Sequence, residues 1–323
     1  MKAVKCSKYG PPEVLQFVEI EKPTPKDNEV LIKVHATSVT VADCRVRGFN
    51  VPLSFWLPAR IALGFWKPKI DILGEELAGE IEYIGKNVTL FKKGDKVFAF
   101  PGHSSFGCYT EYKCMPENAV IAIKPSSICY EEATAIPFGG GTALHFMRKA
   151  NIQCGQKILI YGASGSVGTY AVQLAKCFGA EVTGVCSTTN LKMVESLGTD
   201  KVIDYTKEDF SKKGEKYDVI FDAVGKSTLS ACVKSLKENG TLIQAVATPA
   251  LSIRMKLLSL LSKKKFIGGT LVPKTEDLIY LINLVEKGMI KPVIDRKYTF
   301  EEIVEAHKYV DKGHKKGNVV ITL

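Results

Sequence analysis

The first hundred residues show short runs of alternating apolar and polar positions. Residues 30–39 (VLIKVHATSV) and 95–100 (DKVFAF) are rich in β-branched or aromatic side chains and are bounded by turn formers. Such runs are typical of strands. Residues 78–97 have the glycine-punctuated alternation of short strands that turn back on one another. This part of the chain is therefore predicted to be β-rich.

The pattern changes near Gly155. A short apolar run at 157–162 leads into a glycine-rich turn, and residues 169–179 then show helical spacing and a terminal glycine. Alternation of strands and helices predicts parallel strands with crossover helices, and so a doubly wound sheet. Four further apolar runs are separated by helix-like segments: 180–186, 200–204, 217–225 and 240–246.

The last part of the chain predicts two helices, at 275–288 and 299–313, and a final strand at 317–323. Residues 49–69 (FNVPLSFWLPARIALGFWKPK) contain both tryptophans of the protein and three prolines. This segment resembles a loop with a helical turn more than a strand.

Length and composition fit a folded protein with room for two domains. The chain has 323 residues, of which 46% are hydrophobic and 24% charged. Residues 1–10 lack an apolar core, so no secretory signal is predicted, and no apolar run is long enough to cross a bilayer. We therefore expect a cytoplasmic protein.

The net charge of +10 comes from 44 basic and 34 acidic residues. A basic surface favours anionic partners in general. The lysine clusters at 212–213, 263–265 and 315–316 have no interleaved aromatic side chains for base stacking. We interpret them as solvated faces and predict no nucleic-acid partner.

The nine cysteines are scattered, odd in number and never spaced C-x-x-C. Ligand pairs for a metal usually come from one tight turn, and even Cys108 and Cys114 are too far apart for that. Reduced and mostly buried thiols are therefore predicted. The positions are 6, 44, 108, 114, 129, 154, 177, 186 and 232.

The most informative segment is YGASGSVGTYAVQLAK. From Ala163 it reads A-x-G-x-x-G, with Gly165 and Gly168 as its glycines and Gly162 just before. It follows a predicted strand and opens a predicted helix, which is the context that a dinucleotide-binding loop requires. Glycines let the backbone approach a pyrophosphate, whose charge meets the exposed amides of the helix N-terminus. The other interpretation is a tight strand–helix turn without a ligand.

The next predicted strand ends in neutral donors. NAD-binding proteins usually place Asp or Glu here to bind the ribose 2′-hydroxyl. This chain has Ser187, Thr188, Thr189 and Asn190, with Lys192 close by. Hydroxyls, amides and lysine can bind a 2′-phosphate, whereas a carboxylate repels it. The charge pattern favours NADPH over NADH; alternatively, this is a polar loop in which Ser187 caps a helix.

Taken together, these motifs resemble the medium-chain dehydrogenases/reductases, and among them the zinc-independent quinone oxidoreductase-like branch. The resemblance runs the whole length of the chain, with the motifs in the same order. It is carried by segments 2–48, 74–98, 107–147, 162–176, 198–210 and 317–323.

This resemblance implies a mixed α/β fold with two parts. A GroES-like, β-rich catalytic domain would be formed by residues 1–122 and completed by residues 266–323. A doubly wound Rossmann NADP-binding domain, residues 123–265, would be inserted between them. The β-rich region followed by strand–helix alternation, inferred above from the pattern alone, agrees with this arrangement.

The chain departs from zinc-dependent relatives at their metal ligands. Where those relatives carry Cys and His ligands, this chain has Thr40 and Glu75, and the cluster of four cysteines that holds their structural zinc has no counterpart. Adjacent residues of an extended chain point to opposite sides, so Glu75 and Glu76 are not expected to act as one acid pair. Glu76 is interpreted as structural or supporting. No recognisable spacing makes a three-ligand set from the histidines, at 35, 103, 145, 307 and 314.

Without zinc, the resemblance implies hydride transfer from NADPH to a quinone or an α,β-unsaturated carbonyl, whose conjugation spreads the developing charge. It also implies roles for individual residues. Asp43 and Thr142 would be the catalytic pair, although Asp43 could instead pair with Arg45 or Arg47, and Thr142 could cap a helix. Cofactor contacts would come from Ser164, Gly165, Ser166, Val167 and Gly168 at the pyrophosphate, Ser187, Asn190 and Tyr205 at the 2′-phosphate, and Ala245 along the ribose–nicotinamide path.

Other interpretations stay open. An enoyl-thioester reductase of this family often has a tyrosine after the aspartate, but this chain has Gly48, Phe49 and Asn50 there. A non-catalytic NADPH-binding regulator is the alternative outside enzymes. The aromatics of 49–69, which are Phe55, Trp56, Phe65 and Trp66, would either be buried in their own domain, wall a substrate pocket, or rest on a membrane. Residues 251–266 add apolar beside basic residues, so weak peripheral membrane contact remains a hypothesis. A homodimer, which is common in the family that the chain resembles, is also a hypothesis.

Overall fold

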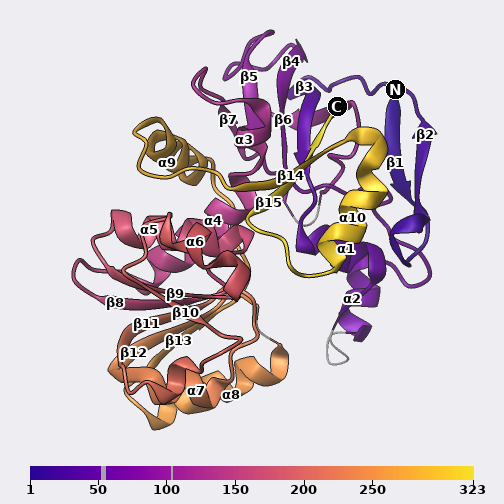
Figure 1. Cartoon of the computed structure of the whole chain (residues 1–323). Helices are drawn as coiled ribbons and strands as arrows, with labels where there is room; N and C mark the ends of the chain where they lie inside the picture. The colour runs from indigo at the N-terminus through magenta and orange to yellow at the C-terminus, as the bar shows by residue number, and fades with distance from the viewer. Residues whose placement is uncertain (52–55, 103–104, 247) are drawn as a thin grey trace. The chain divides into compact units, whose positions relative to one another are not determined.

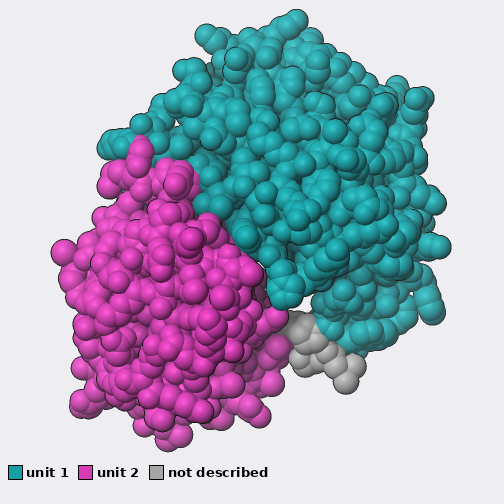
Figure 2. Space-filling model, viewed as in Figure 1, with its two compact units in different colours: residues 1–138, 273–287, 292–323 teal, residues 139–272, 288–291 magenta. Residues whose placement is uncertain are grey.

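The computed structural model describes residues 1–51, 56–102, 105–246 and 248–323. These residues form two compact units, coloured separately in Figure 2. Unit 1 comprises residues 1–138, 273–287 and 292–323, and unit 2 comprises residues 139–272 and 288–291. Each unit has its own sheet and its own core.

Unit 2 contains a six-stranded, fully parallel sheet in the order β10-β9-β8-β11-β12-β13 (Figure 1). Counted from its first strand, this order is 3-2-1-4-5-6, the order of a dinucleotide-binding Rossmann sheet. The strand order reverses between β8 and β11, and ligands bind at the carboxyl ends of the strands at such a point. The strands are β8 (Lys157–Tyr161), β9 (Glu181–Cys186), β10 (Lys201–Asp204), β11 (Tyr217–Asp222), β12 (Leu236–Gln244) and β13 (Lys265–Gly268).

Helices connect these strands. The crossovers of unit 2 include α5 (Ser166–Cys177), α6 (Leu191–Glu195), α7 (Leu229–Ser235) and α8 (Pro249–Leu261), and α4 (Pro137–Ala150) leads into the unit. The predicted strand–helix alternation is thus confirmed. The central strands are apolar throughout because helices cover both faces of such a sheet. Their buried side chains include Leu159, Val185, Ile220 and Leu242.

Unit 1 is β-rich, as predicted. Its larger sheet runs β14-β15-β3-β4-β5-β7, with β6 paired to β3, and β1 pairs with β2. The C-terminal strand β15 is antiparallel to β3, so the end of the chain returns to the sheet formed by its beginning. The strands are β1 (Lys2–Cys6), β2 (Leu15–Glu19), β3 (Glu29–Ser38), β4 (Leu77–Ile84), β5 (Lys96–Ala99), β6 (Tyr112–Pro116), β7 (Ile121–Ile123), β14 (Ile294–Thr299) and β15 (Asn318–Thr322).

In the described part of unit 1, these strands are accompanied by the helices α1 (Val41–Gly48), α2 (Trp56–Leu63), α3 (Tyr130–Thr134), α9 (Thr275–Glu286) and α10 (Ile303–Asp311). Unit 1 first extends to residue 138, because α3 contacts β3, β4 and β5. It resumes at residue 273, and residues 288–291 belong to unit 2. The predicted domain bounds, 122 and 265, stay a prediction.

All nine cysteines lie in the described ranges and are free thiols. Five of them, Cys6, Cys44, Cys108, Cys186 and Cys232, are buried. Within the residues that the structure describes, no helix has both the length and the apolar character needed to cross a membrane.

Candidate cofactor and active site

The turn between β8 and α5 lies at the switch point of the unit 2 sheet. Gly162 has a φ of +82°, which favours glycine. Gly165 is the N-cap of α5 and has no side chain to occupy the helix amides. A Cβ on Gly168 would lie 2.0 Å from the Gly162 carbonyl oxygen, so only glycine allows this packing. The turn therefore presents α5 amides to an anion.

Three of the predicted cofactor residues form one cluster at the end of β9. The Asn190 side-chain amide donates to Ser164 Oγ at 3.1 Å and to Ser187 Oγ at 3.2 Å. Ser164 comes from the β8–α5 turn, whereas Ser187 is the N-cap of the short 3₁₀ turn Thr188–Asn190 and Asn190 is its last residue. The structure thus brings together Ser164, which the sequence analysis placed at the pyrophosphate, and Ser187 and Asn190, which it placed at the 2′-phosphate.

An acidic residue near this cluster was missed in the sequence analysis. Asp204 ends β10, the strand beside β9, and accepts from Thr188 Oγ1 at 2.5 Å and from the Thr206 amide and hydroxyl. The Thr188 hydroxyl is the largest of the contacts that lower the pKa of Asp204. Its carboxylate is nearly buried and engaged with these two threonines. The only sequence signal was its position as the last residue of the next strand.

The other predicted contacts in unit 2 lie at the same edge of the sheet or near it. Tyr205 follows β10, and its half-exposed ring is tilted against Tyr161 with centroids 6.4 Å apart. Ala245 follows β12, and its amide donates to the Asp222 carbonyl at 3.0 Å. Thr142 lies in α4 and is buried.

Two buried polar atoms of unit 2 find no hydrogen-bond partner among the described residues. They are Thr142 Oγ1 and Gln244 Oε1. Buried polar groups are nearly always paired, and each exception requires an explanation. A dinucleotide with its own donors and acceptors would supply such partners. Gln244 ends β12 at the carboxyl edge and was missed, because nothing in the sequence distinguishes it from other polar residues.

The residues of unit 2 therefore fit a bound dinucleotide. The glycine turn and the α5 N-terminus suit a pyrophosphate. The cluster of Ser164, Ser187 and Asn190 supplies neutral donors, and the two unpaired atoms remain for the rest of the cofactor.

In unit 1, Asp43 is fully buried and organises the local backbone. It forms a capping box with Thr40 at the start of α1, and its other oxygen accepts from the Gly74 amide at 2.9 Å. Burial, and then the neighbouring Glu75, raise the pKa of Asp43. The residue joins α1 to the segment before β4, so its observed contacts are those of a positioning residue. Its predicted alternative partners Arg45 and Arg47 are not among these contacts; Arg47 pairs with Asp311.

Glu76 is a second fully buried carboxyl group in this unit. It accepts from the Ser38 hydroxyl and, at 2.8 Å, from the Phe138 amide. Burial raises its pKa from 4.5 to about 8, although both hydrogen bonds act in the opposite direction. Near neutral pH, Glu76 is therefore largely protonated, which agrees with the structural role inferred from the sequence.

A carboxyl group whose pKa rises on folding stabilises the protein most below its unfolded pKa, and this contribution is lost as pH rises through the folded value. Glu76→Gln keeps the shape but removes the titration. We expect the melting temperature of the wild type to fall relative to the variant between pH 4.5 and about 8, by at least about 3 °C. Thermal melts of both proteins across this pH range test the prediction. If the two melting temperatures changed in parallel with pH, the raised pKa of Glu76 would be contradicted.

Thr40 and Glu75, which stand where zinc-dependent relatives are expected to have ligands, are close in space. The Thr40 hydroxyl lies 3.2 Å from Glu75 Oε2 and 2.7 Å from Asp43 Oδ2. In the described ranges, which exclude His103, no group of three His, Cys, Asp or Glu is placed to hold a metal ion. Zinc independence stays a prediction.

An ionic network fixes α1 against α10. The buried guanidinium of Arg47 contacts Asp311 at 2.6 Å, His307 Nδ1 at 3.1 Å and the Gly10 carbonyl at 3.2 Å. Burial and the Arg47 charge lower the pKa of His307 to about 3, so its ring is neutral and Nδ1 accepts. Because α1 also carries Asp43, the network sets the position of that carboxyl group.

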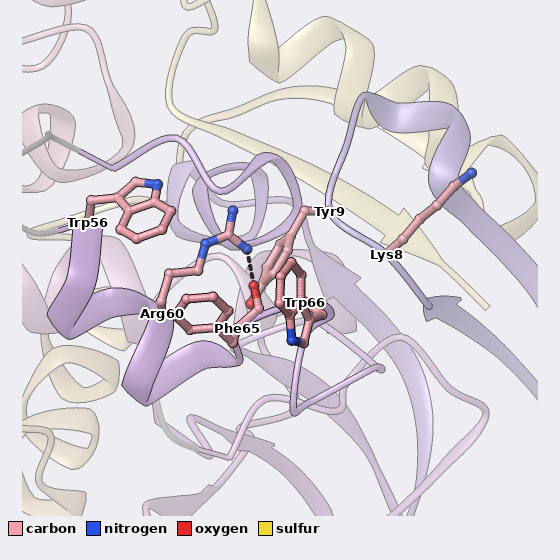
Figure 3. A pocket seen from close by; sticks show the side chains of 6 residues that line it. All are labelled: Lys8, Tyr9, Trp56, Arg60, Phe65 and Trp66. Carbon is pink, nitrogen blue, oxygen red and sulfur yellow. Dashed lines mark hydrogen bonds between the residues drawn. The ribbon is translucent and has the colours of Figure 1, made fainter.

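The aromatic segment is only partly buried in its own unit. The exposed fractions of Trp56, Phe65 and Trp66 are 39%, 46% and 86%, which disagrees with burial in their own domain, the first of the three interpretations of this segment. Phe55 lies outside the described residues. Arg60 stacks on Phe49, 3.8 Å from the ring centroid, and donates to the Phe65 carbonyl at 2.7 Å. A cavity of about 390 Å³ opens here, lined by Lys8, Tyr9, Trp56, Arg60, Phe65 and Trp66 (Figure 3).

Comparison with known families agrees with both units. Residues 26–125 match the alcohol dehydrogenase GroES-like domain, and residues 197–321 match a family described as zinc-binding dehydrogenase. The first match falls in unit 1, and the second covers the later strands of the unit 2 sheet and the C-terminal return to unit 1.

Individual relatives cover the whole chain. A chloroplast envelope quinone oxidoreductase homolog of Arabidopsis thaliana is 34% identical over 99% of this chain and 98% of its own. An NADPH-dependent alkenal/one oxidoreductase of the same plant is 31% identical over 99% of this chain and 79% of its own. The quinone oxidoreductase of Coxiella burnetii superposes with a TM-score of 0.89 at 29% identity, over 100% of this chain and 99% of its own. The chain thus belongs to the medium-chain dehydrogenase/reductase superfamily, in its quinone oxidoreductase-like branch.

Proposed function

We propose that this protein is an NADPH-dependent oxidoreductase that reduces quinones or α,β-unsaturated carbonyls without a metal. The observation that carries the proposal is the site of unit 2, where a glycine-capped helix and a cluster of neutral donors lie at the switch point of a Rossmann sheet. Relatives named as quinone and alkenal/one oxidoreductases, over 30% identical, support the acceptor class.

The chain's contribution is binding and orientation. The α5 amides beyond Gly165 would hold the pyrophosphate, with Ser164, Ser166, Val167 and Gly168 in the same turn. Ser187, Asn190 and Tyr205 would contact the 2′-phosphate, and their neutral or aromatic character adds no repulsion. Ala245 would lie along the ribose–nicotinamide path.

Thr142 and Gln244 complete the proposed cofactor contacts. The unpaired Thr142 hydroxyl supports the predicted contact with the nicotinamide, and we add Gln244 on the same ground. When bound, the reduced nicotinamide supplies a hydride, and a conjugated acceptor spreads the charge that this transfer creates. For Asp43 we propose an indirect role, because its hydrogen bonds hold α1 and Gly74.

The loss of NADPH absorbance in a stopped-flow experiment with a panel of quinones and enones tests this function. We expect turnover with at least one conjugated acceptor. In the reverse direction, we expect no oxidation of a saturated alcohol by NADP⁺. Tight NADPH binding without turnover of any acceptor would instead favour the non-catalytic regulator. Turnover restricted to enoyl thioesters would favour an enoyl-thioester reductase.

Cofactor choice gives a separate prediction. Ser187→Asp places a carboxylate in the proposed 2′-phosphate site, so the affinity for NADPH should fall at least about tenfold while that for NADH is kept or improved. Fluorescence titrations with both cofactors measure this, and Ser196→Asp, on the exposed end of α6, is the matched charge control. Equal losses for both cofactors would contradict the assignment of Ser187.

A homodimer, which the resemblance suggests, and the cytoplasmic location expected in the sequence analysis are further proposals. Light scattering of the purified chain tests the first, and imaging of a tagged chain in its own cell tests the second.

A further inference from the structure

Helix α8 of unit 2 has apolar side chains on two opposite faces. Met255 is buried and Leu251 and Leu258 are partly buried, with the spacing of one helix face. The opposite face carries Ile253, Leu257, Leu260 and Leu261, whose exposed fractions are 63%, 55%, 77% and 82%. Their spacing of four, three and one residues forms a continuous stripe along the helix. Four large aliphatic side chains in one stripe are not the scattered exposure of an ordinary surface.

All charged side chains of α8 are positive. Arg254 and Lys256 are exposed and flank the stripe on its two sides, and residues 263–265 add three lysines just beyond the helix. Residues 239–275 contain no Asp or Glu. The nearest acid before this segment, Glu238, pairs with Lys263 at 3.0 Å. Apart from Lys263, the Lys and Arg side chains of residues 239–275 have no Asp or Glu within that stretch of sequence.

We propose that the exposed face of α8 binds the surface of an anionic lipid bilayer. An interfacial helix buries its apolar stripe at the boundary of headgroups and acyl chains, while flanking Lys and Arg meet anionic headgroups. A second copy of the chain suits this face less well. A two-fold contact of α8 with itself would bring the Arg254 and Lys256 charges of both copies together without carboxylates between them.

Membrane binding would bring the proposed reductase to its acceptors, and in this respect the proposal rests on the proposed function. Apolar quinones and long-chain enones dissolve in bilayers, so a surface-bound reductase would meet them at high local concentration. The membrane contact itself depends only on α8 and can be measured without any acceptor.

A second surface has the same chemistry. In unit 1, Leu57, Ile61 and Trp66 are exposed beside Arg60 and Lys67, and residues 44–70 contain no Asp or Glu. Tryptophan beside cations is common at membrane interfaces. The proposal rests on α8 alone, because the side chains around Arg60 also pack on one another.

The test is flotation of the full chain with phosphatidylcholine vesicles, with and without phosphatidylserine. We expect binding to the anionic vesicles that weakens with salt, because screening shortens the reach of the charges. Leu257→Gln combined with Leu260→Gln and Leu261→Gln keeps helix-forming residues and should lower the partition coefficient at least about tenfold. Arg254→Gln with Lys256→Gln should lower it about tenfold on anionic vesicles only.

The control is a variant with Leu90→Gln, Lys92→Gln and Lys93→Gln, which removes an exposed leucine and two exposed lysines from a turn of unit 1. It should bind as the wild type does. Failure of the wild type to bind anionic vesicles, or wild-type binding by both α8 variants, would overturn the proposal. So would light scattering that shows a dimer which the leucine variant converts to a monomer.

Turnover of a water-soluble quinone separates this proposal from the proposed function. The α8 variants should keep wild-type turnover with that acceptor. If the wild type binds vesicles but reduces no acceptor, the proposed function fails and the membrane surface stands. If it reduces the soluble acceptor but binds no vesicle, the membrane surface alone fails.

Discussion

Gly165→Ala should leave the melting temperature unchanged and weaken NADPH binding roughly ten- to hundredfold, because a methyl group would stand between the α5 amides and the pyrophosphate. A Cβ at this position meets only the Gly162 carbonyl oxygen, at the ordinary contact distance of 3.6 Å. The turn can therefore accept alanine in the free protein. The cost should appear only when the cofactor binds.

Gly168→Ala, three residues on, is the matched comparison. Its Cβ would lie 2.0 Å from the Gly162 carbonyl oxygen and 2.8 Å from the Ala163 Cα, so the backbone must move. We expect a loss of about 1–3 kcal/mol in the free energy of unfolding, together with lost NADPH binding. Thermal melts and NADPH titrations of both variants distinguish the two roles. A Gly165→Ala protein that binds NADPH as tightly as the wild type would place the pyrophosphate elsewhere.

Arg47→Ala is expected to lower the free energy of unfolding by roughly 3 kcal/mol, since it breaks a buried ion pair. The guanidinium also binds His307 and the Gly10 carbonyl, and those acceptors would lose their donor. Arg47→Lys should recover only part of the loss, because an ammonium group cannot reproduce the fork of contacts. Arg45→Ala, an exposed arginine on the same helix, is the control and should change stability by no more than about 0.5 kcal/mol.

Denaturant titration of these variants measures the difference. Equal stability of Arg47→Ala and Arg45→Ala would show that the α1–α10 network does not hold unit 1 together. If the network is sound, Arg47→Ala should also perturb turnover through Asp43, which lies on the same helix.

The sequence predicted most of the fold because the governing signals were local. Strand β8, the glycine turn and α5 form one continuous segment, so their order and chemistry could be read directly. The neutral residues Ser187 and Asn190 also follow a predictable strand end, and the structure places them together with Ser164.

What the sequence could not predict depends on contacts between distant residues. His307 and Arg47 are 260 positions apart, and no spacing rule links them. Helix α3 belongs to unit 1 because it packs on strands far back in the chain. Gln244 and Thr142 stand out only because the folded structure buries them without partners. For the aromatics of residues 56–66 the sequence left three interpretations open, because composition alone does not tell which side chains find a neighbour in the fold.

We propose that this chain transfers hydride from NADPH to a conjugated acceptor using its own residues and no metal. The most direct measurement is NADPH oxidation with a quinone and an enone after exhaustive chelation, with the metal content of the protein determined on the same sample. Turnover should be unchanged by chelation. Turnover that disappears with the metal and returns with added zinc would contradict it.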